Sequence, residues 1–459
     1  MSVKISILKN AGAGLWSKIA TVAFRLVQVP VLLSLLGVDD YGKWLVLYTL
    51  PSWISLANFG FGSVAGNEMS LAIGEGNLDR AVRVFSSTLA IFICIFIAGS
   101  LLLIPVISLL HLETFLKLPA ERGAEIRWVF IWFTFSTLLS FFGELYQGRF
   151  KAARKAHVSI ILYSFRPWVE LLAMIIVLQY TKRLDLLAFS VFCTTVLYIV
   201  AARWLSYRGM PELHFKFSAI SKQLMGPLFR KGFAFQAFPL GNALTYQGTI
   251  IIVQLILGST AVAIFGSVRT LVRSINQLFE LINQVLWPEL SLLFGKGALH
   301  QVARLHRIGV ATSVAVSLFC VLFLAVFGEK IFTIWTGGAF QLSHSLLLFF
   351  LVPILFNSLW FTSSVIHMAS NQHEGLAVRY IIAMALGVLG CAILSYFFGI
   401  AGAAASTVIS DILLIPYVFK KSLLLTNDTV PLFFKGVVKE ATHLNRYLKK
   451  LKRPRIGAA

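Results

Sequence analysis

The chain has 459 residues, of which 58% are hydrophobic and only 13% are charged, and its formal net charge is +21. This composition excludes an ordinary soluble globular domain, in which about a quarter of the residues are charged. Its continuous apolar runs exclude the alternating pattern of a membrane β-barrel, so we interpret the chain as a polytopic helical membrane protein. The basic excess is then expected in cytoplasmic loops, and no nucleic-acid partner is expected.

Twelve membrane-spanning helices are predicted, because a run of about 20 apolar residues can cross the hydrocarbon core of a bilayer. The first run is the least hydrophobic, since Lys18, Arg25 and Gln28 interrupt it. In chain order the predicted spans are 12–37, 41–72, 83–108, 126–148, 157–180, 184–207, 229–257, 260–293, 307–328, 343–369, 375–398 and 400–424. The predicted fold class is an all-α polytopic membrane protein.

An internal repeat relates the two halves of the chain. One ungapped alignment pairs identical residues, including Gly37 with Gly258, Thr49 with Thr270, Glu68 with Glu289, Gly74 with Gly295, Gly76 with Gly297 and Arg83 with Arg304. Apolar bias alone does not explain the paired glutamates and glycines. The alignment moves the second span onto the eighth, so both copies keep one orientation in the membrane. We therefore predict two six-helix bundles related by a parallel repeat, which is typical of alternating-access transporters.

The predicted organisation has four segments. They are an N-terminal six-helix bundle (1–207), a basic cytoplasmic linker (208–228), a C-terminal six-helix bundle (229–424) and a basic amphipathic cytoplasmic tail (425–459). Lys and Arg residues concentrate in the loops on the side of both termini, which the positive-inside rule places in the cytoplasm. The tail indicates either a helix lying on the anionic inner leaflet or a solvated basic segment, and both interpretations stay open.

Two of the predicted spans carry polar stripes. In the eighth span the stripe is formed by Arg269, Arg273, Asn276, Glu280 and Asn283, whose spacing of four, three, four and three residues places them on one helix face. An arginine at the bilayer centre costs roughly 2.5–3.5 kcal/mol, so these side chains should face a hydrated cavity. In the first span the stripe includes Lys18, Arg25 and Gln28.

Such a cavity would suit an anionic ligand. Arginine binds phosphate oxygens through two parallel hydrogen bonds, and a low-dielectric cavity strengthens the attraction. The alternative interpretation is that these cations pair with buried acids or reach the interface by snorkelling. Arg166 and Glu170 lie four residues apart on the fifth span, which predicts a self-neutralising pair, with ligand contact as the alternative.

The acidic residues of the spans give candidates for ion coupling or gating. Asp411 stands alone in its span, so a coupling proton or sodium ion would neutralise it. Glu170, Glu280, Glu68 and Glu289 are further candidates. Glu144 is predicted to form a loop salt bridge with Arg149 or Lys151. No catalytic or metal-binding arrangement is visible, and the four cysteines lie in apolar runs without metal-site spacing.

Four segments carry a family resemblance. LLGVDDYGKW (35–44), LANFGFGSVAGNEMS (56–70) and GEGNLDRAVR (74–83) resemble the start of Wzx-type polysaccharide flippases, and GELYQGRFKAARKAH (143–157) is similar to their loop between spans four and five. The chain thus looks like a member of the multidrug/oligosaccharidyl-lipid/polysaccharide exporter superfamily. The resemblance implies a flippase that moves an undecaprenyl-pyrophosphate-linked oligosaccharide from the cytoplasmic to the periplasmic leaflet of a bacterial inner membrane, for O-antigen or related lipopolysaccharide biosynthesis.

Two alternatives remain. One is a cation-coupled multidrug exporter of the same superfamily, although a pump for cationic drugs would favour acidic cavity residues. The other is a membrane enzyme, a glycan polymerase or ligase, although the longest predicted outer loop (109–125) is short for that class. For the flippase we expect no enzymatic activity and no cofactor beyond a coupling proton or sodium ion. The expected partners are the lipid-linked glycan and membrane lipids, with a polysaccharide polymerase and a chain-length regulator as candidates.

Overall fold

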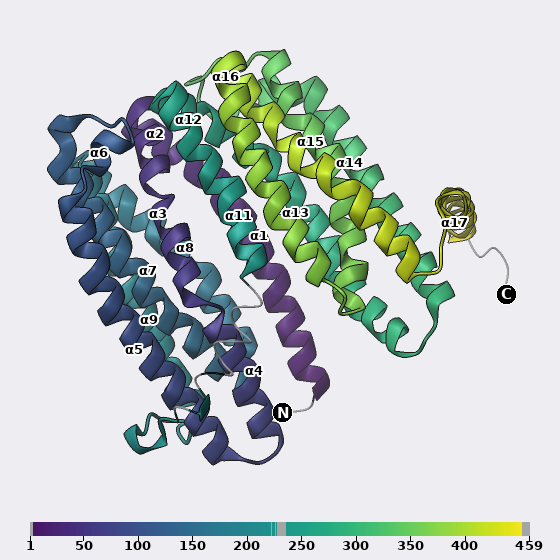
Figure 1. Cartoon of the computed structure of the whole chain (residues 1–459), viewed down its shortest axis with the longest axis horizontal. Coiled ribbons are helices and arrows are strands. Elements are labelled where there is room, and N and C mark those ends of the chain that lie inside the picture. The colour runs from purple at the N-terminus through teal and green to yellow at the C-terminus, as the bar shows by residue number, and fades with distance from the viewer. Residues whose placement is uncertain (1–2, 222, 225, 227–235, 452–459) are drawn as a thin grey trace, which may run out of the picture. The chain divides into compact units, whose positions relative to one another are not determined.

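The computed structural model describes residues 3–221, 223, 224, 226 and 236–451. Every regular element in this part of the chain is helical, and no strand occurs in it, so the all-α prediction is confirmed (Figure 1). Nine of the described helical segments are long and apolar enough to cross a membrane. The full count of twelve spans and their division into two six-helix bundles stay predictions.

The described chain forms two compact units. Unit 1 comprises Met1–Ser267 and Trp335–Phe340, and unit 2 comprises Val268–Ile334 and Gln341–Ala459. The helices up to the start of α13 belong to unit 1: α1 (Val3–Leu36), α2 (Val38–Leu47), α3 (Leu50–Ser55), α4 (Phe61–Gly74), α5 (Leu78–Leu109), α6 (Leu112–Phe115), α7 (Gly123–Ala152), α8 (Ala156–Tyr180), α9 (Leu184–Gly209), α11 (Ala237–Ala243) and α12 (Thr249–Leu257). Short turns of 3₁₀ or π type are η1 (Leu56–Asn58), η2 (Ala120–Arg122), η3 (Phe217–Ala219) and η4 (Leu244–Gly248).

Unit 2 is built from longer helices. They are α13 (Ser259–Gly295), whose first residues belong to unit 1, α14 (Leu299–Trp335), α15 (His344–Ala369), α16 (Glu374–Leu425) and α17 (Val430–Leu451). Contacts in unit 1 hold α12 there, since Gln254 Nε2 donates to the Leu116 carbonyl and Lys117 Nζ to the Leu255 carbonyl. The boundary between the two compact units therefore lies within α13, whereas the predicted boundary between the two bundles is the linker 208–228. That linker and the tail lie partly outside the described residues, and the bundle boundaries stay a prediction.

One predicted span differs from the helices observed, and the boundary between two others is confirmed. The span predicted at 41–72 is divided into α2, α3, η1 and α4, because Pro51 lacks a backbone N–H and Phe59 and Gly60 adopt left-handed conformations. The spans predicted at 375–398 and 400–424 agree with the structure, because the two helical segments of α16 are separated by a break at Gly399 (φ 59°, ψ −141°). A glycine adopts that conformation readily, so the chain changes direction there without a loop.

The repeated glycines of the sequence have repeated conformations. Gly37 (φ 81°, ψ 172°) and Gly258 (φ 85°, ψ 177°) each stand directly before a helix. Gly76 (φ 73°) and Gly297 (φ 68°) each lie in the turn after a helix, α4 and α13 respectively. Equivalent backbone hydrogen bonds run there from the Asn77 amide to the Ala72 carbonyl and from the Ala298 amide to the Leu293 carbonyl. Left-handed glycines of this kind are common at helix ends. The local pairing predicted by the alignment is therefore confirmed at these turns.

The core of unit 1 surrounds α7, which packs against α4, α5, α8 and α9. Its buried aromatic side chains include Phe133 and Phe141, and Phe92 of α5 lies 5.9 Å from Phe141 between ring centroids. Helix α1 packs against α8, where Phe24 and Trp168 lie 5.9 Å apart between ring centroids. Burying a Phe side chain stabilises the fold by roughly 1.5–3 kcal/mol, so these contacts stabilise the packing of α5 on α7 and of α1 on α8.

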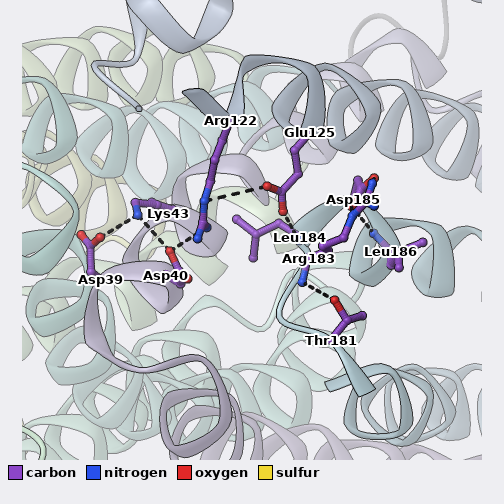
Figure 2. A network of polar contacts seen from close by, with 10 residues as sticks. All are labelled: Asp39, Asp40, Lys43, Arg122, Glu125, Thr181, Arg183, Leu184, Asp185 and Leu186. Carbon is purple, nitrogen blue, oxygen red and sulfur yellow. Dashed lines mark hydrogen bonds and ion pairs between the residues drawn. The ribbon is translucent and has the colours of Figure 1, made fainter. Parts of the chain in front are cut away.

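A polar network joins α2, η2, α7 and α9 of unit 1 (Figure 2). Lys43 Nζ lies 2.6 Å from an Asp39 oxygen and 2.9 Å from an Asp40 oxygen, and Arg122 Nη1 lies 3.0 Å from the same Asp40 oxygen. Glu125 accepts a hydrogen bond from the Leu184 amide at the start of α9. Burial raises the pKa of Asp40, but hydrogen bonds and charges from Lys43 and Arg122 outweigh it and hold that pKa below its usual value.

Candidate functional site

Unit 1 contains a polar cavity of about 570 Å³. We call it the unit 1 cavity, and its lining residues are Gly62, Ser63, Gly66, Asn67, Ser140, Glu144, Gln147, Gly148, Lys151, Ala156, Ser159, Tyr163, Arg166 and Tyr198. They come from α4, α7, α8 and α9, so helices distant in the sequence converge on it. Its volume lies within the range of about 300–1,000 Å³ that is usual for small-molecule sites.

Helical periodicity explains how the polar lining is assembled. On α7, Ser140, Glu144, Gln147 and Lys151 follow one another at intervals of four, three and four residues. On α8, Ser159, Tyr163 and Arg166 follow at intervals of four and three. These intervals place each set on one face of its helix, one above the other. The two faces meet at the cavity.

Glycines on α4 make room for the cavity residues. A Cβ atom on Gly62 would lie 2.6 Å from the Glu144 Cβ, and one on Gly66 would lie 2.9 Å from the Gly148 Cα. Any side chain at these positions would therefore force α4 and α7 apart. The Glu144 carboxylate thus lies directly against the α4 backbone.

Hydrogen bonds orient the charged groups of the cavity. Glu144 accepts a hydrogen bond from Asn58 Nδ2, and Lys151 Nζ donates to Asn67 Oδ1. Arg166 Nη2 donates to Thr195 Oγ1 over 3.0 Å. Its guanidinium carbon lies 5.4 Å from the centroid of the Tyr198 ring, a cation–π arrangement.

The neutral side chains of the cavity offer both donors and acceptors. Gln147 Nε2 donates to the Tyr198 hydroxyl over 3.1 Å, and the Tyr163 and Tyr198 rings lie 6.2 Å apart. Hydroxyl and amide groups can each donate and accept hydrogen bonds, as the hydroxyls of a sugar do. With two cations and one carboxylate, the lining suits a hydrophilic ligand that carries hydroxyl groups and negative charge.

Comparison with known proteins assigns the family. Residues 7–294 match the family described as polysaccharide biosynthesis protein. The chain belongs to this family. A curated relative, the putative O-antigen export protein of Yersinia pseudotuberculosis, is 26% identical over 296 residues, which cover 63% of this chain and 65% of the relative.

The fold is that of transporters in the MOP superfamily. An inward-facing multidrug resistance MATE transporter of that superfamily superposes with a TM-score of 0.74 at 12% identity, covering 89% of this chain and 96% of its own. A MOP superfamily transporter from Pyrococcus furiosus, whose binding pocket is described as having reverse polarity, superposes with a TM-score of 0.56 at 13% identity, covering 92% and 94%. Together with the membrane-crossing helices, these findings make this polysaccharide biosynthesis protein a multi-pass membrane protein with a transporter fold.

Of the substrate residues predicted from the sequence, Arg166 lines the unit 1 cavity. Lys18, Arg25 and Gln28 are half-buried on α1 of unit 1, outside the cavity lining. On α13 of unit 2, Arg269, Arg273, Asn276 and Glu280 are half-buried. Asn283 is buried and donates to the Phe361 carbonyl over 3.2 Å, which gives it a structural role between α13 and α15. The roles of the two cationic stripes stay predictions.

Of two predicted ion pairs, one is indirect and the other is wrong. Arg166 donates to Thr195 of α9 and Glu170 accepts from the Tyr48 hydroxyl over 3.2 Å, so the two side chains form no direct ion pair, although the Arg166 charge still acts on the Glu170 carboxylate. Glu144 forms no salt bridge with a loop cation, because its partner is Asn58. Arg149 is fully buried instead, where it donates to the Met210 carbonyl and covers the Tyr207 ring at 3.5 Å.

The remaining acidic candidates have distinct surroundings. Asp411 is buried in unit 2, where its Oδ1 accepts hydrogen bonds from Trp360 Nε1 at 2.6 Å and from Asn357 Nδ2 at 3.3 Å. Glu68 pairs with Arg80 at 2.9 Å, whereas its repeat counterpart Glu289 is exposed. Within the part of the chain that the structure describes, no group of three or more His, Cys, Asp or Glu side chains could hold a metal ion.

Sequence reasoning missed most of the cavity. Glu144, Gln147, Lys151 and Tyr163 line it, yet none of them was a predicted ligand residue. The stripe on α7 has the same spacing that singled out α13, so the same criterion applied to the span 126–148 would have found part of it. Its contact with α4 also has a sequence signal, because Gly62 and Gly66 form a Gly-x-x-x-Gly motif that allows close approach of membrane helices.

Proposed function

We propose that this chain is a flippase that moves an undecaprenyl-pyrophosphate-linked oligosaccharide from the cytoplasmic to the periplasmic leaflet of a bacterial inner membrane. The observation that carries the proposal is the unit 1 cavity, whose hydroxyl, amide and cationic groups suit a phosphorylated glycan. Family membership and the transporter fold support it, as does the name of the Yersinia relative. The product would serve surface polysaccharide synthesis such as that of O-antigen.

In this proposal the unit 1 cavity receives sugar residues of the head group. Ser140, Gln147 and Tyr163 would exchange hydrogen bonds with sugar hydroxyls. Arg166 would bind a negatively charged group, since a guanidinium makes strong charge-assisted hydrogen bonds with such oxygens. The polyprenyl chain would stay in the lipid, because moving its apolar surface into a polar cavity is unfavourable.

The pyrophosphate is assigned to the cationic stripes. Lys18 and Arg25 on α1, with Gln28, and Arg269 and Arg273 on α13, with Asn276, would each contact it during the transport cycle. Strongly hydrated phosphate oxygens need such partners when they leave water. The two stripes belong to different units. Each can therefore be mutated and tested separately.

Coupling and partners complete the proposal. Asp411 is the candidate for binding a coupling proton or sodium ion, and Glu68, Glu170, Glu280 and Glu289 are candidates for coupling or gating. Both termini would lie in the cytoplasm, following the positive-inside rule. A polysaccharide polymerase and a chain-length regulator would act after translocation. No enzymatic activity is assigned.

A second candidate function is export of small cationic drugs. It is favoured by the fold shared with multidrug resistance MATE transporters. The cavity argues against it, because Lys151 and Arg166 outnumber the single lining carboxylate of Glu144. An excess of positive charge repels cationic ligands in a low-dielectric site.

Proteoliposomes distinguish the two functions. The purified protein is reconstituted with an undecaprenyl-pyrophosphate-linked oligosaccharide that carries a dithionite-sensitive NBD group, and the fraction of probe bleached from outside is followed in time. The flippase proposal predicts that the protected inner-leaflet fraction becomes accessible, and that a cationic dye is not transported in parallel vesicles. Transport of the dye without movement of the lipid-linked glycan would overturn the proposal.

A further inference from the structure

Helix α17 differs in direction from the helices before it. Figure 1 shows α17 nearly end-on, whereas α14, α15 and α16 of the same unit are seen from the side. Those three helices are long and apolar enough to cross a membrane. A helix that lies across them at one end therefore runs along the membrane plane. The distribution of basic residues predicts that this end is cytoplasmic.

One face of α17 is docked on the rest of unit 2. Phe433 is only 2% exposed and packs between the Phe419 ring, at 5.0 Å, and the His306 ring, at 5.2 Å. Val310 and Leu423 complete this apolar contact. A buried Phe side chain supplies enough apolar area to hold the start of α17 against α14 and α16.

Ion pairs fix the same contact. Arg307 on α14 lies 2.7 Å from Asp428, in the short connection before α17. Arg304, also on α14, lies 2.9 Å from Glu440 on α17. The Arg307 side chain lies against α17 at Gly436. A Cβ atom on Gly436 would be 2.5 Å from Arg307 Nη1. The position of α17 is therefore tied to the end of α14.

A second face of α17 is apolar and exposed. Val430, Phe434 and Val438 follow at intervals of four residues and are 50%, 59% and 69% exposed. At 3.6 residues per turn they share one side of the helix. Lys435 and Lys439 are exposed on the adjoining side, and the sequence continues with Arg446, Lys449 and Lys450.

We propose that α17 binds the anionic surface of the inner leaflet, with Val430 and Phe434 inserted at the boundary between headgroups and acyl chains and with Lys435 and Lys439 bound to acidic phospholipid headgroups. Three observations support an anionic lipid surface as the partner. The helix lies across the membrane-crossing helices, its exposed apolar face adjoins a basic face, and the docked face fixes the orientation of these two faces. Amphipathic helices with this arrangement lie in membrane interfaces. Each basic residue near an anionic surface strengthens the attraction roughly fivefold.

As a consequence, lipid binding to α17 would act on a membrane-crossing helix of unit 2. Because Arg307 and Phe433 join α17 to α14, the energy of lipid binding acts on the end of a membrane-crossing helix of unit 2. The inference does not depend on the substrate. It would hold for a glycan flippase and for a drug exporter alike.

The test uses the full chain in lipid nanodiscs. Phe434→Cys is labelled with bimane in a background whose four native cysteines are replaced, and quenching by a lipid with a spin label at the headgroup boundary is measured. Discs contain phosphatidylcholine alone or with about one third phosphatidylglycerol. Gln301→Cys, in the exposed first turn of α14, supplies the aqueous reference.

The proposal predicts several-fold stronger quenching at residue 434 than at residue 301 when phosphatidylglycerol is present. Lys435→Gln combined with Lys439→Gln should reduce quenching at residue 434 to its value in phosphatidylcholine discs. Lys296→Gln, which removes an exposed loop cation outside α17, should leave it unchanged. Quenching equal to the aqueous reference, or insensitive to both phosphatidylglycerol and the two lysines, would overturn the proposal. Quenching that depends on two protein copies sharing one disc would also overturn it, since the face would then be a protein interface.

Discussion

Gly66 on α4 and Gly148 on α7 lie so close together that a Cβ atom on Gly148 would be 2.8 Å from the Gly66 Cα. Both residues line the unit 1 cavity. Gly148→Val should therefore separate α4 from α7 and destabilise the protein by about 1–3 kcal/mol, the usual cost of overpacking. We expect a lower midpoint of thermal unfolding for the purified protein, measured by loss of the monodisperse peak in size-exclusion chromatography.

Gly74→Ala is the matched control for this substitution. A Cβ atom there would meet nothing within 4 Å, and the residue ends the same helix, α4. The control should unfold within a degree or two of the wild type. If Gly148→Val were equally stable, the close contact between α4 and α7 would be wrong.

The charges of the unit 1 cavity give a second prediction. Arg166→Gln should weaken binding of the lipid-linked glycan about tenfold or more, because a hydrogen bond to a charged group contributes roughly 1.5–3 kcal/mol. Glu144→Gln should leave the affinity unchanged or raise it, since it removes a negative charge that faces an anionic head group. Initial rates of NBD-glycan translocation at several probe concentrations separate affinity from turnover.

Leu172→Ala is the control for both variants, since Leu172 is on α8 and 58% exposed, away from the cavity lining. It should translocate the probe at the wild-type rate. A drug exporter would show the opposite charge dependence, with loss of cationic dye transport in Glu144→Gln. That result would favour the second candidate function.

The sequence predicted the helical architecture well because that architecture depends on local properties. Apolar runs set the approximate positions of the membrane-crossing helices, and Gly37 and Gly258, which the alignment pairs, have the same backbone conformation. The break of the second span was missed, because apolar content is uniform across Pro51 and Phe59. The boundary predicted between the spans 375–398 and 400–424 coincides with the non-helical Gly399.

The cavity was harder to predict because its contacts are tertiary. Arg166 and Glu170 have the spacing of a helical ion pair, but Thr195 and Tyr48 on other helices supply competing partners. Glu144 was assigned to the nearest cations in the sequence, whereas the structure places it against α4, opposite Gly62. The Gly-x-x-x-Gly interval of Gly62 and Gly66 indicates a close helix contact, but it does not say which helix is the partner.

The polar network around Asp40 predicts a dependence of stability on pH. Lys43 and Arg122 lower the pKa of Asp40 in the folded protein. The network therefore stabilises the fold above the unfolded pKa of about 3.9, and this contribution is lost as the pH falls through the lower folded pKa. Asp40→Asn should unfold at a lower temperature than the wild type at pH 6, and the difference should shrink below about pH 4.

Glu121→Gln provides the comparison, because Glu121 is exposed in the neighbouring turn η2. Its unfolding midpoint should follow the wild type at every pH. If the difference in unfolding midpoint between Asp40→Asn and the wild type stayed constant down to pH 3, the assigned role of Asp40 would be contradicted.

Phe433 and Phe434 are adjacent on α17 but have opposite surroundings, since Phe433 is 2% exposed and Phe434 is 59% exposed. Phe433→Ala should undock α17, because removing a buried Phe side chain costs about 3–5 kcal/mol. Trypsin cleavage after Lys435 and Lys439, followed by mass spectrometry of the detergent-solubilised protein, should then be at least about tenfold faster. Phe434→Ala should be cleaved at the wild-type rate, and equal acceleration in both variants would refute the docking of Phe433.

Asp411 allows a structural role to be separated from an ion-coupling role. Asp411→Ala removes the acceptor of the Trp360 and Asn357 hydrogen bonds and leaves buried donors unpaired, so it should destabilise unit 2 by about 1–3 kcal/mol. Asp411→Asn keeps a carbonyl oxygen for Trp360 but carries no charge, so its unfolding temperature should stay near that of the wild type. If Asp411 binds the coupling ion, Asp411→Asn should translocate the glycan probe at a rate that no longer responds to an imposed proton or sodium gradient. Wild-type acceleration by either gradient in this stable variant would show that the coupling ion binds elsewhere.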